Sequence, residues 1–181
     1  MRFLLPKWCD LCWTEWVSFS ERFTHLPSSP GIYRVRITGA DKIAYLGQTG
    51  RSLRERLGGL RHNTLQDIMP FNDPHTAAPS LWAWRDAASV DYECSCAEVH
   101  RAKAERHALE CHLLWQYRCE AGESTLCNHG RFHARYVKSR NRHSGFGGRR
   151  LSPDEPDNPG AGFSREPYSF KGRLSTRIGW V

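Results

Sequence analysis

The chain has 181 residues, with 26 Lys and Arg against 19 Asp and Glu, so its formal net charge at pH 7 is +7. No apolar run approaches the roughly 18 residues that a membrane-spanning helix needs, and the apolar start at Phe3–Leu5 is too short for the core of a signal peptide. We therefore expect a soluble, cytoplasmic protein that does not contact membranes, with one modest core built on its many aromatic residues.

The excess of positive charge is confined to residues 124–153, which contain no acidic residue. Basic and acidic residues are equal in number before this segment and after it. The cations of the segment are Arg131, Arg135, Lys138, Arg140, Arg142, Arg149 and Arg150. A concentrated charge of this kind favours a polyanionic partner, and the interleaved aromatic residues favour nucleic acid. The alternative is a tail that only improves solubility.

The first third of the chain predicts one helix and two strands. The spacing of Trp13, Trp16 and Phe23 predicts a short amphipathic helix over 13–25. Turn-forming residues follow at 27–31. Alternation of apolar and polar residues then predicts a strand over 32–37, and residues 42–47 are expected to return beside it as a hairpin.

Further along, Thr49 or Ser52 can cap a helix with Leu53, Leu57 and Leu60 on one side. Residues 81–85 predict a short hydrophobic piece, helical or extended. A third strand is expected over 90–96, and good helix formers predict a long helix over 97–117. The fold class is therefore α+β, with a small antiparallel sheet of three strands flanked by helices.

Seven cysteines without a secretory signal argue against a disulfide framework. Cys9 and Cys12 form a Cys-x-x-Cys pair, and Cys94 and Cys96 would point to one face of a strand. A structural zinc site needs four ligands, and a second pair at standard spacing is missing. Buried or idle thiols are therefore favoured, while a zinc site stays open.

Several short motifs occur in a fixed order. Gly31-Ile32-Tyr33 is followed, after eleven intervening residues, by Tyr45-Leu46-Gly47. Arg56 follows on the predicted helix, Glu110 stands on the long predicted helix before Leu113, Leu114 and Tyr117, and Asn128 comes after that helix. This order resembles that of the GIY-YIG nuclease family, in particular its small stand-alone bacterial members, over about residues 20–135, with Leu46 in place of the usual Ile or Val.

The resemblance implies a Mg²⁺-dependent DNA endonuclease, with Mn²⁺ able to substitute for Mg²⁺. Glu110 would hold a single metal ion, and Arg56 would stabilise charge on the phosphate. Tyr33 would take the proton from the attacking water, which requires a lowered pKa, and Tyr45 would hydrogen-bond the phosphate or the water. Asn128 would anchor the local backbone or the glutamate.

One position departs from the family pattern. Many members have His or Lys one turn after the arginine, where this chain has Leu60. His62 is the nearest candidate and completes the catalytic set that the resemblance implies. Residues expected to bind nucleic acid are Arg54, Arg61, Arg131, Arg135, Lys138, Arg140 and Arg142. The resemblance divides the chain into an N-terminal helical extension (1–27), a nuclease domain (28–135) and a basic tail (136–181).

Each of these residues also has an ordinary structural interpretation. Strand tyrosines usually pack, Arg54 could exchange roles with Arg56, and Glu105 is the rival of Glu110. Asp73 and His75 could shape a loop or join the substrate groove, while Trp82 and Trp84 are expected in the core. At the level of function, the alternatives are a catalytically impaired DNA-binding module and an RNA-directed nuclease. A homodimer also stays open, because a single site cuts a single strand.

Overall fold

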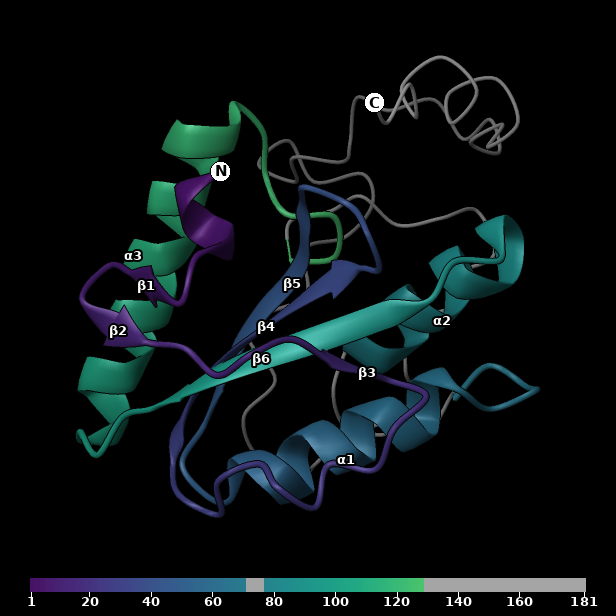
Figure 1. Ribbon diagram of the computed structural model, residues 1–181, viewed down its shortest axis with the longest axis horizontal. Helices are drawn as coiled ribbons and strands as arrows, with labels where there is room; N and C mark the ends of the chain where they lie inside the picture. Colours follow the sequence, from purple (N-terminus) through teal and green to yellow (C-terminus); the bar gives the residue numbers. More distant parts are fainter. Residues whose placement is uncertain (71–76, 129–181) are drawn as a thin grey trace, which may run out of the picture.

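The computed structural model describes residues 1–70 and 77–128. These residues form an α+β fold in which antiparallel strands are covered by three α-helices (Figure 1). None of the helices in these two ranges is long and apolar enough to cross a membrane. The predicted fold class is confirmed at this level.

The main sheet has four antiparallel strands in the order β3-β6-β4-β5. Its three long strands are β4 (Gly31–Ile37), β5 (Ile43–Thr49) and β6 (Tyr92–Glu98), and they match the three predicted strands within two residues at each end. β3 (Val17–Ser18) adds a short fourth strand beside β6. The central position of β4 explains why five of its seven residues are buried.

The hairpin β4–β5 sets the positions of its two tyrosines. Tyr33 pairs with Gly47, and Val35 pairs with Tyr45. Because residues two apart on a strand share a face, Tyr33 and Tyr45 lie diagonally on the same side of the sheet. A bulge follows at Val35/Arg36, where the pairing with β5 shifts by one residue.

The three helices occur in the predicted regions, but the third begins six residues later and ends four residues later than the predicted 97–117, because residues 97 and 98 belong to β6. α1 (Leu53–Thr64) begins at Ser52, whose hydroxyl accepts a hydrogen bond from Glu55 N at 3.2 Å, so Ser52 rather than Thr49 is the N-cap. Residues 81–85 are helical, within α2 (Ala77–Ala88). α3 (Lys103–Ala121) ends at Gly122, whose φ of 72° closes the helix in the left-handed conformation.

The sheet is covered on both faces (Figure 1). One face packs with α1 and α2, and this cluster contains Tyr33, Leu57 and Trp84. The other face packs with α3 and the N-terminal residues, and this cluster contains Phe3, Leu46 and Leu113. Trp82 and Trp84 are both buried, as predicted.

The helix predicted over 13–25 is wrong. Residues before β4 form a 3-10 turn η1 (Arg2–Leu4), a hairpin of β1 (Lys7–Trp8) and β2 (Leu11–Cys12), and then β3. The sheet supplies the backbone partners that a helix would have supplied internally: Thr14 N donates to Cys96 O and Phe19 N to Tyr92 O, both at 2.8 Å. The segment 1–27 is therefore not a helical extension, because tertiary pairing overrides its helical spacing.

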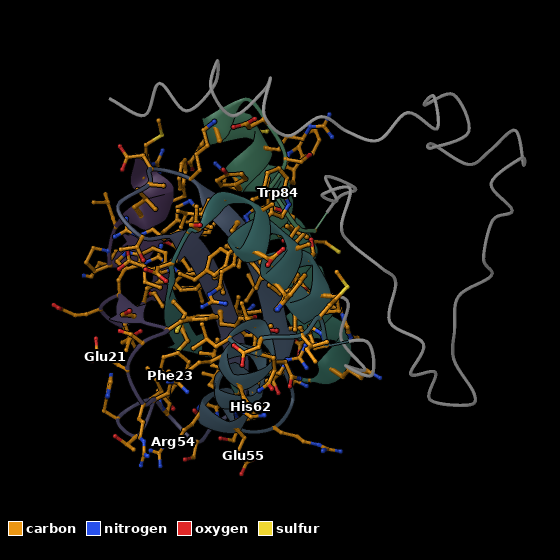
Figure 2. The ribbon with its side chains drawn as sticks, turned by 90° about the vertical axis from the view of Figure 1, so that its right-hand side faces the viewer. Glu21, Phe23, Arg54, Glu55, His62 and Trp84 are labelled. Carbon is orange, nitrogen blue, oxygen red and sulfur yellow. The ribbon has the colours of Figure 1, made fainter. Side chains whose placement is uncertain are left out.

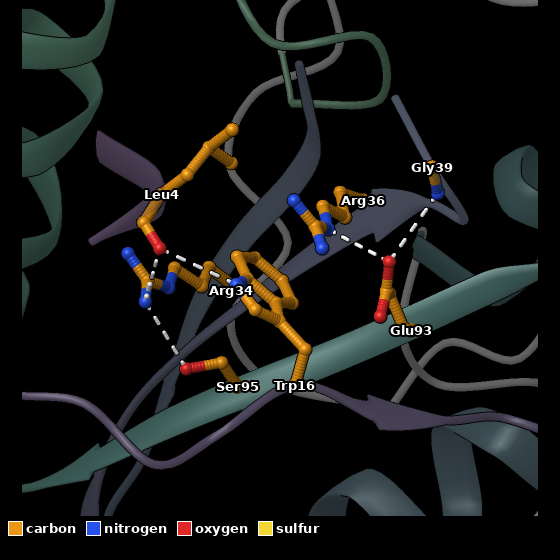
Figure 3. A network of polar contacts seen from close by, with 7 residues as sticks. All are labelled: Leu4, Trp16, Arg34, Arg36, Gly39, Glu93 and Ser95. Carbon is orange, nitrogen blue, oxygen red and sulfur yellow. Dashed lines mark hydrogen bonds and ion pairs between the residues drawn. The ribbon is translucent and has the colours of Figure 1, made fainter. Parts of the chain in front are cut away.

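Arg34 fastens the N-terminal turn to the sheet (Figure 3). Its guanidinium donates to Phe3 O at 2.5 Å, to Leu5 O at 3.1 Å and to Ser95 Oγ at 3.3 Å. It also lies over the rings of Trp13 and Trp16, at 4.3 and 4.6 Å from their centroids. Burial, with the nearby charge of Arg36, lowers the pKa of Arg34 to about 9.

All seven cysteines lie in the described ranges and are free thiols. Cys94 and Cys96 are buried in the same cluster, so the prediction that they share a face of the strand is confirmed. Cys9 lies in the two-residue turn of the β1–β2 hairpin, where both turn residues have positive φ. Within residues 1–70 and 77–128, no three or more His, Cys, Asp and Glu side chains cluster as a metal site would require.

Candidate functional site

The two motif tyrosines meet on the face of the sheet covered by α1. Their ring centroids are 6.1 Å apart, with 38° between the ring planes, and Tyr33 is fully buried. A Cβ atom at Gly47 would lie 2.6 Å from both Cζ and Oη of Tyr33 and 2.8 Å from Cε1 of Tyr45. Glycine at position 47 is therefore needed for the tyrosines to pack as they do.

Arg56 reaches the same point from α1. Leu53, Leu57 and Leu60 bury one side of this helix, which fixes its rotation about its own axis. Arg56 then places its Nε 3.0 Å from Tyr33 Oη and its Cζ 5.9 Å from the centre of the Tyr33 ring. Arg54 makes no such contact, since its Nε donates to Leu26 O at 2.7 Å. Of the two candidate arginines, the structure brings Arg56 to the tyrosines.

The Tyr33 oxygen accepts a hydrogen bond from Arg56 Nε at 3.0 Å, and the Tyr45 ring lies beside the Tyr33 ring. Burial raises the pKa of Tyr33, and the charge and hydrogen bond of Arg56 oppose that rise. Burial also raises the pKa of Tyr45 well above its usual value. The lowered pKa expected for Tyr33 is not found, because the cost of burying a phenolate exceeds the help of one guanidinium. Arg56 nevertheless donates to the oxygen that would carry the negative charge of a Tyr33 phenolate.

Glu110 joins this group from the other side of the sheet. α3 packs against β5, the outer strand of the four, and the Glu110 side chain is 19% exposed. Burial raises the pKa of Glu110, which His107 and Arg56 lower again, and the charge of Glu110 in turn raises the pKa of both tyrosines. These mutual effects place Tyr33, Tyr45, Arg56 and Glu110 within electrostatic reach of one another. Glu105, the rival carboxylate, instead accepts from Ala102 N at 2.9 Å at the start of α3.

Asn128 holds the outer edge of β5. Its Oδ1 accepts from Leu46 N at 2.8 Å, and its Nδ2 donates to Leu46 O at 2.7 Å. Thr125 Oγ1 donates to the same Oδ1 at 2.8 Å and orients the amide. Asn128 thus positions the strand that carries Tyr45, which agrees with the expected role in anchoring backbone.

His62 does not join the group. It is exposed on α1 (Figure 2), and the hydrogen bonds that it makes to described residues go to Gln66, one turn later. His62 lies six positions after Arg56 on the helix, which is a rotation of about 120° around the axis. Leu60, at the position where the family pattern has His or Lys, is buried in the core.

Two residues expected to bind nucleic acid have contacts inside the chain. Arg54 and Arg61 both bind backbone carbonyls of the loop before β4, and Arg61 Nε lies 2.6 Å from Phe19 O. These bonds fasten α1 to the loop, and a role of either arginine toward nucleic acid stays a prediction. The remaining candidates lie outside the described residues: Arg131, Arg135, Lys138, Arg140 and Arg142, as well as Asp73 and His75.

The sequence reasoning missed His107, Gln48 and Arg106. His107 Nδ1 lies 3.6 Å from Glu110 Oε2, and its Nε2 lies 3.4 Å from Gln48 Nε2. The signal was present, because residues three apart on a helix are neighbours. Gln48 and Arg106 gave no comparable signal, since only the packing of α3 on β5 brings them together.

The donor set fits a hydrated hard cation better than a closed metal site. Glu110 offers oxygen ligands and is partly open to solvent, and a Mg²⁺ ion commonly binds one or two carboxylates while keeping several waters. Among the described residues, Glu110 is not part of any cluster of three or more His, Cys, Asp and Glu side chains. A single ion held by Glu110 is therefore the arrangement that this chemistry supports.

Comparison of the chain with models of known protein families, with curated proteins and with solved structures finds no match.

Proposed function

We propose that this protein is a divalent-metal-dependent endonuclease of the GIY-YIG type that hydrolyses phosphodiester bonds in DNA. One observation carries the proposal: the guanidinium of Arg56 donates to the oxygen of Tyr33 at 3.0 Å, and the Tyr45 ring packs beside the Tyr33 ring with 6.1 Å between their centroids. The residues come from β4, β5 and α1, and Glu110 of α3 lies within reach of their charges. Glycine is required at both tyrosine motifs, because a Cβ atom at Gly31 would collide with Ala97 O and one at Gly47 with Tyr33.

The chemistry follows from this arrangement. To act as the base, Tyr33 first releases its own proton to solvent, and Arg56 stabilises the resulting phenolate. The phenolate then takes a proton from the water that attacks the phosphorus and is a neutral phenol again. Arg56 presents its remaining N–H groups to a phosphate oxygen, where charge grows in the transition state. Glu110 would hold a divalent cation, which when bound would supply Lewis acidity and positive charge for phosphoryl transfer. Asn128 keeps β5, and with it Tyr45, in register.

The test uses the full chain with supercoiled plasmid, single-stranded DNA and RNA, each in Mg²⁺, Mn²⁺ or EDTA. Tyr33→Phe removes the proposed base and should slow cleavage about 10²–10⁴-fold. Loss of charge stabilisation in Arg56→Ala should cost about 10²–10³-fold. Glu110→Gln should abolish metal-dependent cleavage. The matched control is Glu105→Gln on the same helix, which should cleave at the rate of the unchanged protein.

Circular dichroism and thermal melts establish that each variant is folded. Full activity of a folded Glu110→Gln protein would contradict the proposal, as would cleavage that persists in EDTA. Cleavage of RNA alone would identify an RNA-directed nuclease instead.

The second candidate is a DNA-binding module with impaired catalysis. Two observations favour it: Leu60 is buried where the family pattern has His or Lys, and burial raises the pKa of the proposed base Tyr33. Fluorescence anisotropy with a labelled oligonucleotide in Ca²⁺ separates the two candidates. Binding without cleavage in any of the metals tested would identify the module, and cleavage that depends on Glu110 would identify the nuclease.

A further inference from the structure

A row of polar side chains connects the core to Glu110. Arg106 Nε donates to Gln48 Oε1 at 3.3 Å, Gln48 Nε2 lies 3.4 Å from His107 Nε2, and His107 Nδ1 lies 3.6 Å from Glu110 Oε2. Gln48 belongs to β5 and the other three residues to α3, so the row spans the contact between strand and helix. None of these contacts is explained by the proposed reaction, which uses only the carboxylate at its end.

The order of donors and acceptors along the row is set by Arg106. A guanidinium can only donate, so the atom of Gln48 that it contacts is the oxygen. The amide group of Gln48 must then face His107 and donate to Nε2, which leaves the imidazole proton on Nδ1. Nδ1 is the nitrogen that faces Glu110. These contacts therefore specify the Nδ1–H tautomer of His107.

Arg106 is itself firmly held. It is buried although it lies on a helix whose neighbouring residues are exposed, and it also donates to Arg101 O. A Cβ atom at Gly50 would lie 2.5 Å from one of its terminal nitrogens, so the guanidinium occupies the space beside this glycine. Arg106, at the start of the row, therefore lies against the turn between β5 and α1.

We propose that His107 is a positioning residue for Glu110: its Nδ1–H, set by Gln48 and Arg106, holds Oε2 and leaves Oε1 free for the cation. The inference rests on the metal-binding part of the proposed function. With one oxygen committed, Glu110 binds the cation through a single atom. His107 itself is not a ligand, because the nitrogen nearest the carboxylate carries the proton. Partners of this kind typically contribute 10- to 100-fold to metal affinity.

The experiment uses Mn²⁺ alone as the probe, with the full chain at pH 8 and no nucleic acid. Free Mn²⁺ is counted by electron paramagnetic resonance during titration. His107→Ala should weaken binding about 10-fold, and His107→Asn, whose amide N–H can take the place of Nδ1–H, should restore most of it. His112→Ala is the matched control on α3, because His112 is exposed and lies outside the row, and it should leave the affinity unchanged.

Two spectroscopic measurements test the tautomer of His107 and its place outside the metal's ligands. Nitrogen NMR should find the Nδ1–H tautomer of His107 in the metal-free protein. Gln48→Glu replaces the donating amide by a carboxylate that can only accept, so it should move the proton to Nε2. In the Mn²⁺ complex of the unchanged protein, electron spin-echo spectra should lack the coupling of a directly bound imidazole nitrogen.

An Nε2–H tautomer in the unchanged protein would overturn the inference, and so would a directly bound nitrogen or an unchanged affinity in His107→Ala. Glu110→Gln must also lose Mn²⁺ binding, since otherwise Glu110 is not the ligand. These measurements need no substrate. If Mn²⁺ binds as described and no nucleic acid is cleaved, the inference holds and the proposed nuclease activity fails.

Discussion

Gly47→Ala tests whether the tyrosine pair depends on the missing side chain at this position. The added Cβ would lie 2.6 Å from Cζ and Oη of Tyr33, whereas an ordinary contact needs about 3.5–4.0 Å. The ring must therefore move by roughly 1 Å. Tyr33 is fully buried and bonded to Arg56, so it has nowhere to move without breaking packing or that bond.

The magnitude follows from two opposing effects. Overpacking of a buried site costs about 1–3 kcal/mol. Replacing glycine restricts the unfolded chain and returns about 0.4–1 kcal/mol, because Gly47 has no left-handed φ that alanine would have to avoid. The net loss in the free energy of unfolding should be about 1–2 kcal/mol. The cleavage rate of the folded variant should also fall, since the displaced oxygen is the proposed base.

Urea denaturation followed by tryptophan fluorescence measures the loss, and Gly58→Ala is the matched control. Gly58 lies inside α1 with open space around its missing side chain, so alanine should stabilise the protein by about 0.5–1 kcal/mol. The two substitutions are chemically identical and are expected to have opposite signs. A Gly47→Ala protein as stable and as active as the unchanged one would refute the packing argument.

Three further predictions concern capping, pH and the basic tail. Ser52→Ala removes the N-cap of α1 and should cost about 1 kcal/mol in the same denaturation assay; no loss would mean that the cap contributes nothing. Burial raises the pKa of Glu110 in the folded state, so ionisation of Glu110 destabilises the fold as pH rises. Glu110→Gln should therefore be more stable than the unchanged protein at pH 7, and this difference in stability should vanish below pH 4. An equal difference at both pH values would contradict the raised pKa. Deletion of residues 136–181 should weaken DNA binding and flatten the slope of log affinity against log salt by about 0.9 for each phosphate that the segment neutralises, and an unchanged slope would exclude this segment from the interface.

The sequence predicted the elements whose signal is local. Alternation along residues 32–37 and the leucines of α1 are sufficient for these elements, because each pattern lies within one short segment of the chain. The segment around Trp13 and Trp16 was assigned wrongly for the opposite reason. Its helical spacing is real, but its backbone groups find partners on β6, far away in the sequence.

The residues of the candidate site were likewise predicted only in part. The motif order predicted that Tyr33, Tyr45, Arg56 and Glu110 belong to one site, and the structure places them within reach of one another. His62 was chosen only by its nearness in sequence, and the rotation of the helix turns it away. No sequence pattern indicated Gln48 and Arg106, because only the packing of α3 against β5 brings the two side chains into contact.

The contact of Asn128 with β5 also bears on how the protein avoids self-association. β5 is an edge strand of the sheet, and such strands expose unpaired amides and carbonyls that can recruit another chain. Here Asn128 occupies both groups of Leu46, Cys127 N donates to Ala44 O, and the Tyr117 hydroxyl lies 3.3 Å from Ile43 N. A side-chain amide thus takes the place of an additional strand at Leu46. Residues 43–46 of β5 are shielded from edge-to-edge pairing as long as residues 125–128 stay in place.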